Sequence, residues 1–175
     1  MRVAFVAAEA APFAKAGGLA DVVGALPKAL SKLGVETAVF IPRYGSIQGN
    51  MAKTASFSVD FGGEKNEVVV FRAFFPKSEV PVFFLDFPPY FDRPGIYGEE
   101  GTDYSDNLRR FAFFSKAALV AISALSWSPD VFHIHDWHTA LLPLYKRELG
   151  IPGKTVLTIH NLAFQGWFPR PEWEF

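Results

Sequence analysis

The sequence predicts an α/β fold, a doubly wound and mostly parallel Rossmann-like sheet with a β-hairpin insertion. Short, continuous apolar runs, which are typical of strands buried on both faces, alternate along the chain with segments of helical apolar spacing. Glycine-containing turns separate the two kinds of segment. Two strand-like runs on either side of Gly62-Gly63 interrupt the alternation and predict the hairpin.

The N-terminal part of the chain predicts one βαβ unit. Residues 2–8 form a continuous apolar run, which indicates a buried strand. Leucines and valines recur at helical spacing over residues 19–33, and Gly34 ends this helix. Pro27 lies inside the pattern, so we expect the helix to kink or break there. Residues 35–42 predict a second strand, which a right-handed crossover makes parallel to the first.

The remainder of the chain predicts the hairpin and then further alternation of strands and helices. Residues 88–101 contain too much proline and glycine for a regular element. The next helix is almost wholly apolar at its end, which indicates burial on most sides, and Ser105 or Asp106 lies near its start. We expect a hairpin of residues 54–61 and 66–75, a strand at 80–87, a loop at 88–101, a helix from about 103 to 125, a strand at 130–135, a helix at 137–149 and a strand at 154–160.

Composition restricts the class of protein. The chain has 175 residues, 50% of them hydrophobic, with 19 Phe, which is enough for one domain with a sizeable core. The net charge of −1 argues against a broad nucleic-acid surface or an anionic-membrane surface as a partner. The N-terminal apolar run is short for a signal peptide, and no run is long enough to span a membrane. With no cysteine in the chain, we expect a cytoplasmic protein.

Polar residues follow three of the predicted strands. In open sheets of this kind, ligands bind outside the carboxyl ends of the strands. Because three separate strands bring unusual side chains to the same edge, we expect a ligand site there. The three groups are residues 15–18, residues 135–138, and His160 with Asn161.

The first group predicts an anion site. Gly17 and Gly18 are unfavourable in a regular element and suit a place where the backbone bends or is approached closely. Lys15 beside backbone amides at a helix N-terminus suits a phosphate, although the pattern is neither GxGxxG nor a P-loop. Asp21 either favours the helix dipole or accepts a hydrogen bond from a sugar hydroxyl. The alternative is a tight strand-to-helix turn without a ligand.

The stretch HIHDWH contains four potential metal ligands, His133, His135, Asp136 and His138. We nevertheless favour a polar pocket for hydroxyl groups over a metal. His133 and His135 alternate with apolar residues on a buried strand, and Asp136 is a natural N-cap of the next helix. Trp137 would add an apolar face, and sugars combine hydroxyls with C–H faces.

The last group and one loop add further candidates. His160 and Asn161 end a strand, where they form either a capped turn or part of the ligand cleft. Tyr97 lies on a Gly- and Pro-rich loop together with Asp92 and Arg93, and it either is solvated or stacks on a sugar. A serine hydrolase is disfavoured, because the sequence contains no G-x-S-x-G turn.

Four motifs together resemble a known family. They are VAFVAAEAAPFAKAGGLADVVGALPKAL (residues 3–30), FDRPGIYG (91–98), FHIHDWHTALLPLY (132–145) and TIHNLAFQG (158–166). In this order they resemble bacterial glycogen synthases and plant starch synthases, whose usual loop K-[TV]-G-G-L here has Ala16 at its second position. The resemblance implies a retaining GT-B glucosyltransferase. Such an enzyme moves glucose from ADP-glucose, or in some members UDP-glucose, to the non-reducing end of an α-1,4-glucan without a metal or other cofactor.

The resemblance also implies residue roles. Lys15 and the Gly17-Gly18 backbone would contact the diphosphate and the transferring glucose, and Asp21 would lie close to the donor sugar. His160 would be the catalytic residue, stabilising oxocarbenium character through its ring or its backbone carbonyl. The sugar-binding part of the cleft would be lined by Tyr97, Asp136, Trp137 and Asn161.

The resemblance further implies that half of the active site is absent from this sequence. The family's second Rossmann-like domain binds the nucleotide and contains glutamates spaced E-x7-E. We therefore expect residues 1–175 to be a single, incomplete, N-terminal acceptor-side domain that lacks its C-terminal partner domain and is not an efficient transferase alone. The alternatives are a non-catalytic module that binds glucan or sugar phosphate, and a metal-dependent hydrolase built on HIHDWH.

Overall fold

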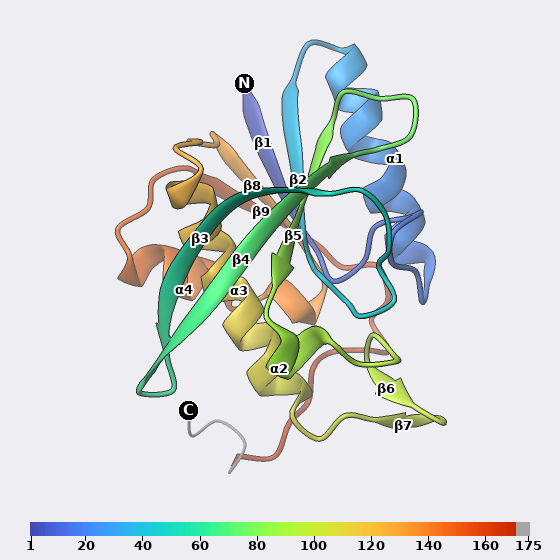
Figure 1. The fold of residues 1–175 in the computed structure, drawn as a ribbon, viewed down its shortest axis with the longest axis vertical. Coiled ribbons are helices and arrows are strands. Elements are labelled where there is room, and N and C mark those ends of the chain that lie inside the picture. Colours follow the sequence, from blue (N-terminus) through green and yellow to red (C-terminus); the bar gives the residue numbers. More distant parts are fainter. Residues whose placement is uncertain (171–175) are drawn as a thin grey trace.

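The computed structural model describes residues 1–170, and nearly all of its regular structure belongs to one α/β arrangement (Figure 1). The strands of the main sheet are β1 (Arg2–Val6), β2 (Glu36–Pro42), β3 (Ala52–Phe61), β4 (Glu64–Phe74), β5 (Pro81–Asp86), β8 (Val131–His135) and β9 (Lys154–Thr158). The helices are α1 (Gly18–Lys32), α2 (Pro88–Phe91), α3 (Asn107–Ala124), the 3-10 turn η1 (Trp137–Thr139) and α4 (Leu142–Glu148).

The main sheet confirms the predicted fold class. Its seven strands are ordered β3-β4-β5-β2-β1-β8-β9. The five strands from β5 to β9 are parallel, whereas β3 and β4 form an antiparallel hairpin on one edge. The chain moves from β1 through α1 to β2 in one direction and from β5 through α3 to β8 in the other. Because parallel crossovers are right-handed, this reversal puts α1 and α3 on opposite faces of the sheet, as Figure 1 shows.

The first βαβ unit is confirmed, but the break at Pro27 is wrong. α1 continues through Pro27 without interruption, although proline removes one helical hydrogen bond. Pro27 is buried, and its carbonyl accepts a hydrogen bond from Thr37 Oγ1 of β2 at 3.1 Å. Packing on the sheet therefore keeps the helix continuous where local propensity favours a break.

The segment between β5 and α3 has more regular structure than the sequence predicts. It contains α2 and a small hairpin of β6 (Gly98–Glu99) and β7 (Thr102–Asp103). α3 starts at Asn107 and not near residue 103, because the preceding residues pair in this hairpin. Asp106 occupies the N-cap position, but its carboxylate binds Arg93 at 2.6 Å and caps no backbone N–H.

The predicted helix 137–149 is divided into a 3-10 turn, η1, and a separate α-helix, α4. η1 ends at Thr139, and α4 starts at Leu142 with Pro143 in its first turn. Proline has no N–H to donate to the carbonyl of Thr139, so one helix cannot run through both segments. Proline is favourable in the first turn of a helix, where this N–H would have no partner, and α4 therefore starts there.

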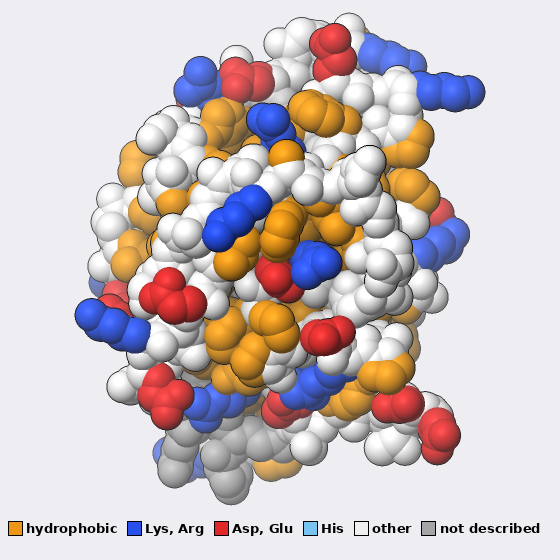
Figure 2. All heavy atoms as spheres, viewed as in Figure 1, with side chains coloured by type: hydrophobic (Ala, Val, Ile, Leu, Met, Phe, Trp, Pro, Cys, Tyr) orange, Lys and Arg blue, Asp and Glu red, His pale blue; other side chains and the backbone are white. Residues whose placement is uncertain are grey.

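The core lies between the helices and the sheet and is rich in phenylalanine. Phe5, Phe40, Phe84, Phe114 and Phe132 are fully buried. Figure 2 shows one face of the molecule, on which cationic and anionic side chains are interspersed and not gathered by sign. No helix within residues 1–170 has the length and apolar character needed to cross a membrane.

Candidate functional site

A cleft of about 570 Å³ opens at the carboxyl ends of β1, β8 and β9. This is the switch point of the sheet, where the crossovers change direction between β1 and β8. The three predicted polar groups meet there, as expected from their places after the strands. The predicted residues that line the cleft are Gly17, Gly18, Tyr97, Asp136, Trp137, His160 and Asn161.

Glu9 is a central residue of the site that sequence analysis missed. It is only 3% exposed, and its Oε2 accepts hydrogen bonds from the amides of Ala16 at 2.5 Å and Gly17 at 2.9 Å. Its Oε1 accepts a hydrogen bond from the Tyr97 hydroxyl at 2.5 Å. A carboxylate of the chain itself therefore binds the Gly17 amide, which was expected to bind phosphate, together with the adjacent amide of Ala16. The available signal was a lone acidic residue among alanines directly after a buried strand.

Gly17 and Gly18 have no reason within the described chain to be glycine. Gly17 has extended backbone angles, with φ −140° and ψ −166°, and Gly18 starts α1. A Cβ atom added at either position would have no atom of residues 1–170 within 4 Å. Both residues line the cleft, so the space that their missing side chains leave is open to a ligand.

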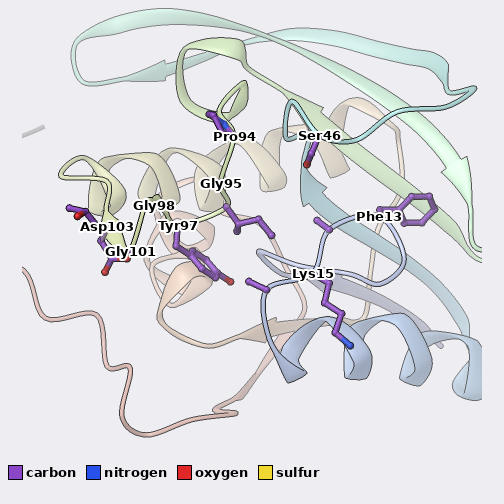
Figure 3. Close-up of a pocket in the computed structure, with 13 residues that line it drawn as sticks. Phe13, Lys15, Ser46, Pro94, Gly95, Tyr97, Gly98, Gly101 and Asp103 are labelled. Carbon is purple, nitrogen blue, oxygen red and sulfur yellow. The ribbon is translucent and has the colours of Figure 1, made fainter.

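Lys15 lies beside the cleft and not in its lining. Its Nζ is 2.7 Å from Asp21 Oδ1 and 2.8 Å from Oδ2. It lines a neighbouring pocket of about 480 Å³, together with Phe13, Ser46 and the loop that contains Tyr97. In Figure 3 the Lys15 side chain extends along the start of α1. Tyr97 lines both pockets. The structure thus pairs two residues to which sequence analysis gave separate roles.

Tyr97 is held by its ring and its hydroxyl. The ring stacks on His138 with centroids 4.7 Å apart, and the hydroxyl donates to Glu9. Burial raises the pKa of Tyr97 far above its ordinary value, so the hydroxyl keeps its proton and acts as a donor. The tyrosine is therefore part of the wall of the cleft and not a solvated loop residue.

α3 fixes the loop that contains Tyr97. Arg110 is fully buried, and it donates from Nε to the carbonyl of Tyr90 at 2.7 Å and from Nη1 to that of Ile96 at 3.1 Å. Asn107 Nδ2 donates to the carbonyl of Tyr97 at 2.7 Å. Burial lowers the pKa of Arg110. The side chains of α3 thus fix the position of the loop from which Tyr97 enters the cleft.

Asp136 joins the ends of β8 and β9. Its Oδ1 accepts a hydrogen bond from the amide of His160 at 2.7 Å, and its own amide donates to the carbonyl of Thr158 at 2.9 Å. Its φ of 55° is in the left-handed region, which is unfavourable for a residue with a side chain. The predicted helix-capping role is wrong, because the carboxylate makes no capping hydrogen bond and reaches across to the next strand.

The two histidines of β8, half-buried His133 and fully buried His135, form a row that ends at half-buried His160. His133 Nε2 lies 2.7 Å from Thr158 Oγ1, and His135 Nδ1 lies 2.9 Å from His160 Nε2. Burial lowers the pKa of His135 to about 3, helped by the neighbouring histidines, and it also lowers the pKa of His133. His133 and His135 are therefore neutral at physiological pH.

The potential metal ligands of HIHDWH do not converge. His138 packs its ring against Tyr97, and burial lowers its pKa to about 3. The Asp136 carboxylate binds the His160 amide, and His135 faces the His160 ring. Within residues 1–170, no three His, Cys, Asp or Glu side chains are arranged so that they could hold a metal ion.

Trp137 and Asn161 complete the lining. The Trp137 ring contacts His138 and Phe111, with centroids 4.1 Å and 5.4 Å away, and it is half-buried. Asn161 is exposed, and its Oδ1 accepts a hydrogen bond from the amide of Ala163 at 2.9 Å. Asn161 therefore both stabilises a turn and lines the cleft, so the turn and the cleft position, predicted as alternatives, occur together.

The fold and the site define a Rossmann-like α/β domain with a ligand cleft at its switch point. A family model described as the starch synthase catalytic domain matches residues 2–175, and the chain belongs to this family. The resemblance that the four motifs predict is thereby confirmed.

The relatives are enzymes of glucan synthesis. The chain is 41% identical over 183 residues to the glycogen synthase of Geotalea daltonii and 42% identical over 180 residues to that of Geobacillus thermodenitrificans. Both comparisons cover 97% of this chain but only 37% and 36% of the relatives. A solved structure of the catalytic domain of starch synthase IV from Arabidopsis thaliana, bound to ADP and acarbose, matches with a TM-score of 0.84 and 32% identity. It covers 97% of this chain and 36% of that one, so the chain spans little more than a third of its relatives' length.

Proposed function

We propose that the chain is the N-terminal, acceptor-side part of a retaining glucosyltransferase that moves glucose from ADP-glucose to the non-reducing end of an α-1,4-glucan. The membership in the starch synthase family and the relatives named glycogen synthase support this proposal. The choice of ADP-glucose is supported by the plant starch synthase of similar structure, which was solved with ADP and acarbose bound.

One observation of the chain itself favours this function most. Gly17 and Gly18 line the cleft, and an added Cβ at either position would meet no other part of residues 1–170. Two side chains are therefore absent where no other part of residues 1–170 needs the space, directly at the start of α1. The N–H groups of the first helical turn have no intrahelical partner, and they favour an anion such as a diphosphate.

The geometry changes the predicted phosphate contacts. Glu9 already accepts hydrogen bonds from the amides of Ala16 and Gly17, so the diphosphate is left with Lys15 and with the amides from Gly18 onward. Lys15 forms an exposed ion pair with Asp21, which water and salt weaken, so Lys15 can turn to a phosphate at little cost. Asp21 then remains beside the donor sugar.

The other wall of the cleft suits a sugar. The Asp136 carboxylate and the Asn161 amide carbonyl offer oxygens to hydroxyl groups, and Trp137 offers an apolar face to C–H groups. His160 lies beside them, where its ring or its backbone carbonyl stabilises positive charge that develops on the transferred glucose. We propose that this chemistry uses no metal or other cofactor, that it takes place in the cytoplasm, and that the remaining two thirds of a full-length synthase supply the nucleotide-binding wall.

The test is glucose transfer by the full-length gene product. We expect labelled glucose from ADP-glucose to enter glycogen with the full-length protein, and much less of it with residues 1–175 alone. Gly18→Val fills the space beside the first turn of α1, and we expect it to lower kcat/KM at least about tenfold. Ala25→Val, an exposed change on the same helix, is the matched control and should leave kcat/KM unchanged.

Three results would contradict the proposal. Transfer from neither ADP-glucose nor UDP-glucose by the full-length protein would leave a glucan-binding module as the function, provided that glycogen still binds. Full activity of Gly18→Val would show that the donor does not approach the glycine loop. Efficient transfer by residues 1–175 alone would show that this chain contains a complete active site.

A further inference from the structure

The ring of His160 has one polar partner in the structure, and that partner is a second histidine. His160 Nε2 lies 2.9 Å from His135 Nδ1, and the two rings are nearly parallel, with an interplanar angle of 24°. His160 Nδ1 makes no hydrogen bond within residues 1–170, and His160 lines the cleft. A hydrogen bond between two ring nitrogens needs one proton, so one histidine donates and the other accepts.

The surroundings of His135 decide which ring donates. His135 is fully buried, and its Nε2 has no hydrogen-bond partner within residues 1–170. If His160 donated, the single proton of neutral His135 would have to sit on Nε2, as a buried N–H without an acceptor. Such orphaned donors are rare and costly in proteins. If His135 donates from Nδ1, its Nε2 keeps only a lone pair. Burial and the adjacent histidines favour the neutral form of His135, since they lower its pKa to about 3.

We propose that His135 is a positioning residue that donates from Nδ1 to His160 Nε2 and so holds His160 as its neutral, Nδ1-protonated tautomer. The catalytic meaning of this arrangement rests on the proposed glucosyl transfer. With Nε2 occupied, Nδ1–H is the ring donor that remains for a sugar oxygen in the cleft. The ring has no positive charge in this state, whereas an imidazolium would repel positive charge developing on the transferred glucose.

The backbone geometry adds to this positioning. The amide of His160 donates to Asp136 Oδ1 at 2.7 Å, so both the main chain and the ring of His160 are fixed from the end of β8. His135 in turn packs against the rings of Phe5 and His133, with centroids 6.0 Å and 4.4 Å away. These ring contacts hold the His135 ring, and with it the donor Nδ1, in its orientation toward His160.

The first test is the tautomer itself, measured by 15N NMR of histidine-labelled full-length protein, with His160→Gln used to assign the His160 signals. We expect the His160 Nε2 signal to be of the unprotonated type and the Nδ1 signal of the protonated type. His135→Phe keeps the ring packing and removes both nitrogens, so it should release His160 into a mixture of tautomers. His135→Asn places an amide donor near the position of Nδ1 and should restore the single tautomer. A protonated Nε2 in the unmutated protein would overturn the proposal.

The second test is glucose transfer by the same variants. We expect His135→Phe to lower kcat about tenfold with little change in KM, and His135→Asn to recover activity to within about threefold. His133→Phe is the matched control, because it changes the neighbouring ring, whose hydrogen bond is to Thr158, and it should leave activity within about twofold. Unchanged kcat in His135→Phe would refute the positioning role. If the full-length protein transfers no glucose, the proposed function fails, and the 15N signals still test the tautomer independently.

Discussion

The two sides of the cleft are built differently. The inner wall is formed by the buried side chains of Glu9, His135 and His138 and the half-buried ones of Tyr97 and Asp136, which form hydrogen bonds or pack together. The outer rim, formed by Lys15 and Asp21, is one ion pair whose side chains are 54% and 59% exposed. The inner wall therefore contributes to the stability of this chain, whereas the outer rim contributes little and is free to serve a ligand.

The largest expected effect is the pH dependence of the inner wall. His135 and His138 have pKa values of about 3 in the folded chain, below the ordinary value of 6.5. Between pH 3 and pH 6.5 the unfolded chain therefore binds more protons than the folded chain. Stability is then complete above pH 6.5 and decreases as the pH falls toward 3. We expect the free energy of unfolding at pH 5 to be about 4 kcal/mol lower than at pH 7.

Urea denaturation between pH 7 and pH 5 measures this change. His138→Phe removes one of the two groups, so it should reduce the pH dependence by about half. A free energy of unfolding that is constant over this range would show that these histidines are protonated in the folded chain as easily as in the unfolded one.

The next effect concerns the carboxylate of the inner wall. Glu9→Ala leaves the amides of Ala16 and Gly17 and the hydroxyl of Tyr97 without their acceptor. We expect the free energy of unfolding to fall by about 3 kcal/mol. Asp21→Ala on the outer rim is the control, with a change below about 0.5 kcal/mol, because its ion pair is exposed. Equal losses in both variants would remove the distinction between the two sides.

A change in the outer rim should act on activity and not on stability. Lys15→Gln removes a charge-assisted contact to the diphosphate, so kcat/KM for ADP-glucose in the full-length protein should fall by at least about 30-fold, or about 2 kcal/mol. The free energy of unfolding should stay within about 0.5 kcal/mol. If kcat/KM equals that of the unmutated protein, the phosphate role of Lys15 is wrong.

The smallest effect is the loss of one hydroxyl from the inner wall. Tyr97→Phe keeps the ring on His138 and removes the hydrogen bond to Glu9. We expect the free energy of unfolding to decrease by about 1 kcal/mol. Thermal or chemical denaturation measures it, with Tyr145→Phe as a control, since Tyr145 lies outside the cleft. A loss no larger than that of the control would mean that the hydroxyl adds nothing.

Local patterns were sufficient for the strands and for the edge of the sheet at which the site lies. Apolar runs at residues 2–8 and 35–42 and the repeated Gly turns predict β1, β2 and the crossover between them, and the structure contains them. The errors lie where a local preference competes with packing or with a missing backbone donor. Pro27 does not break α1 because the helix packs on the sheet, and Pro143 starts α4 because it cannot extend η1.

The sequence by itself determined the fold class, the family and the edge of the sheet where polar residues meet, because these depend on periodicity and on motifs within single elements. Only the tertiary structure decided which groups bind each other. Glu9 and Tyr97 are 88 residues apart in the chain, and His135 and His160 are 25 apart. Periodicity shows which face of an element is buried, but the partner of a buried polar group depends on how distant elements pack, and that decides which amides and which ring nitrogen remain for a ligand.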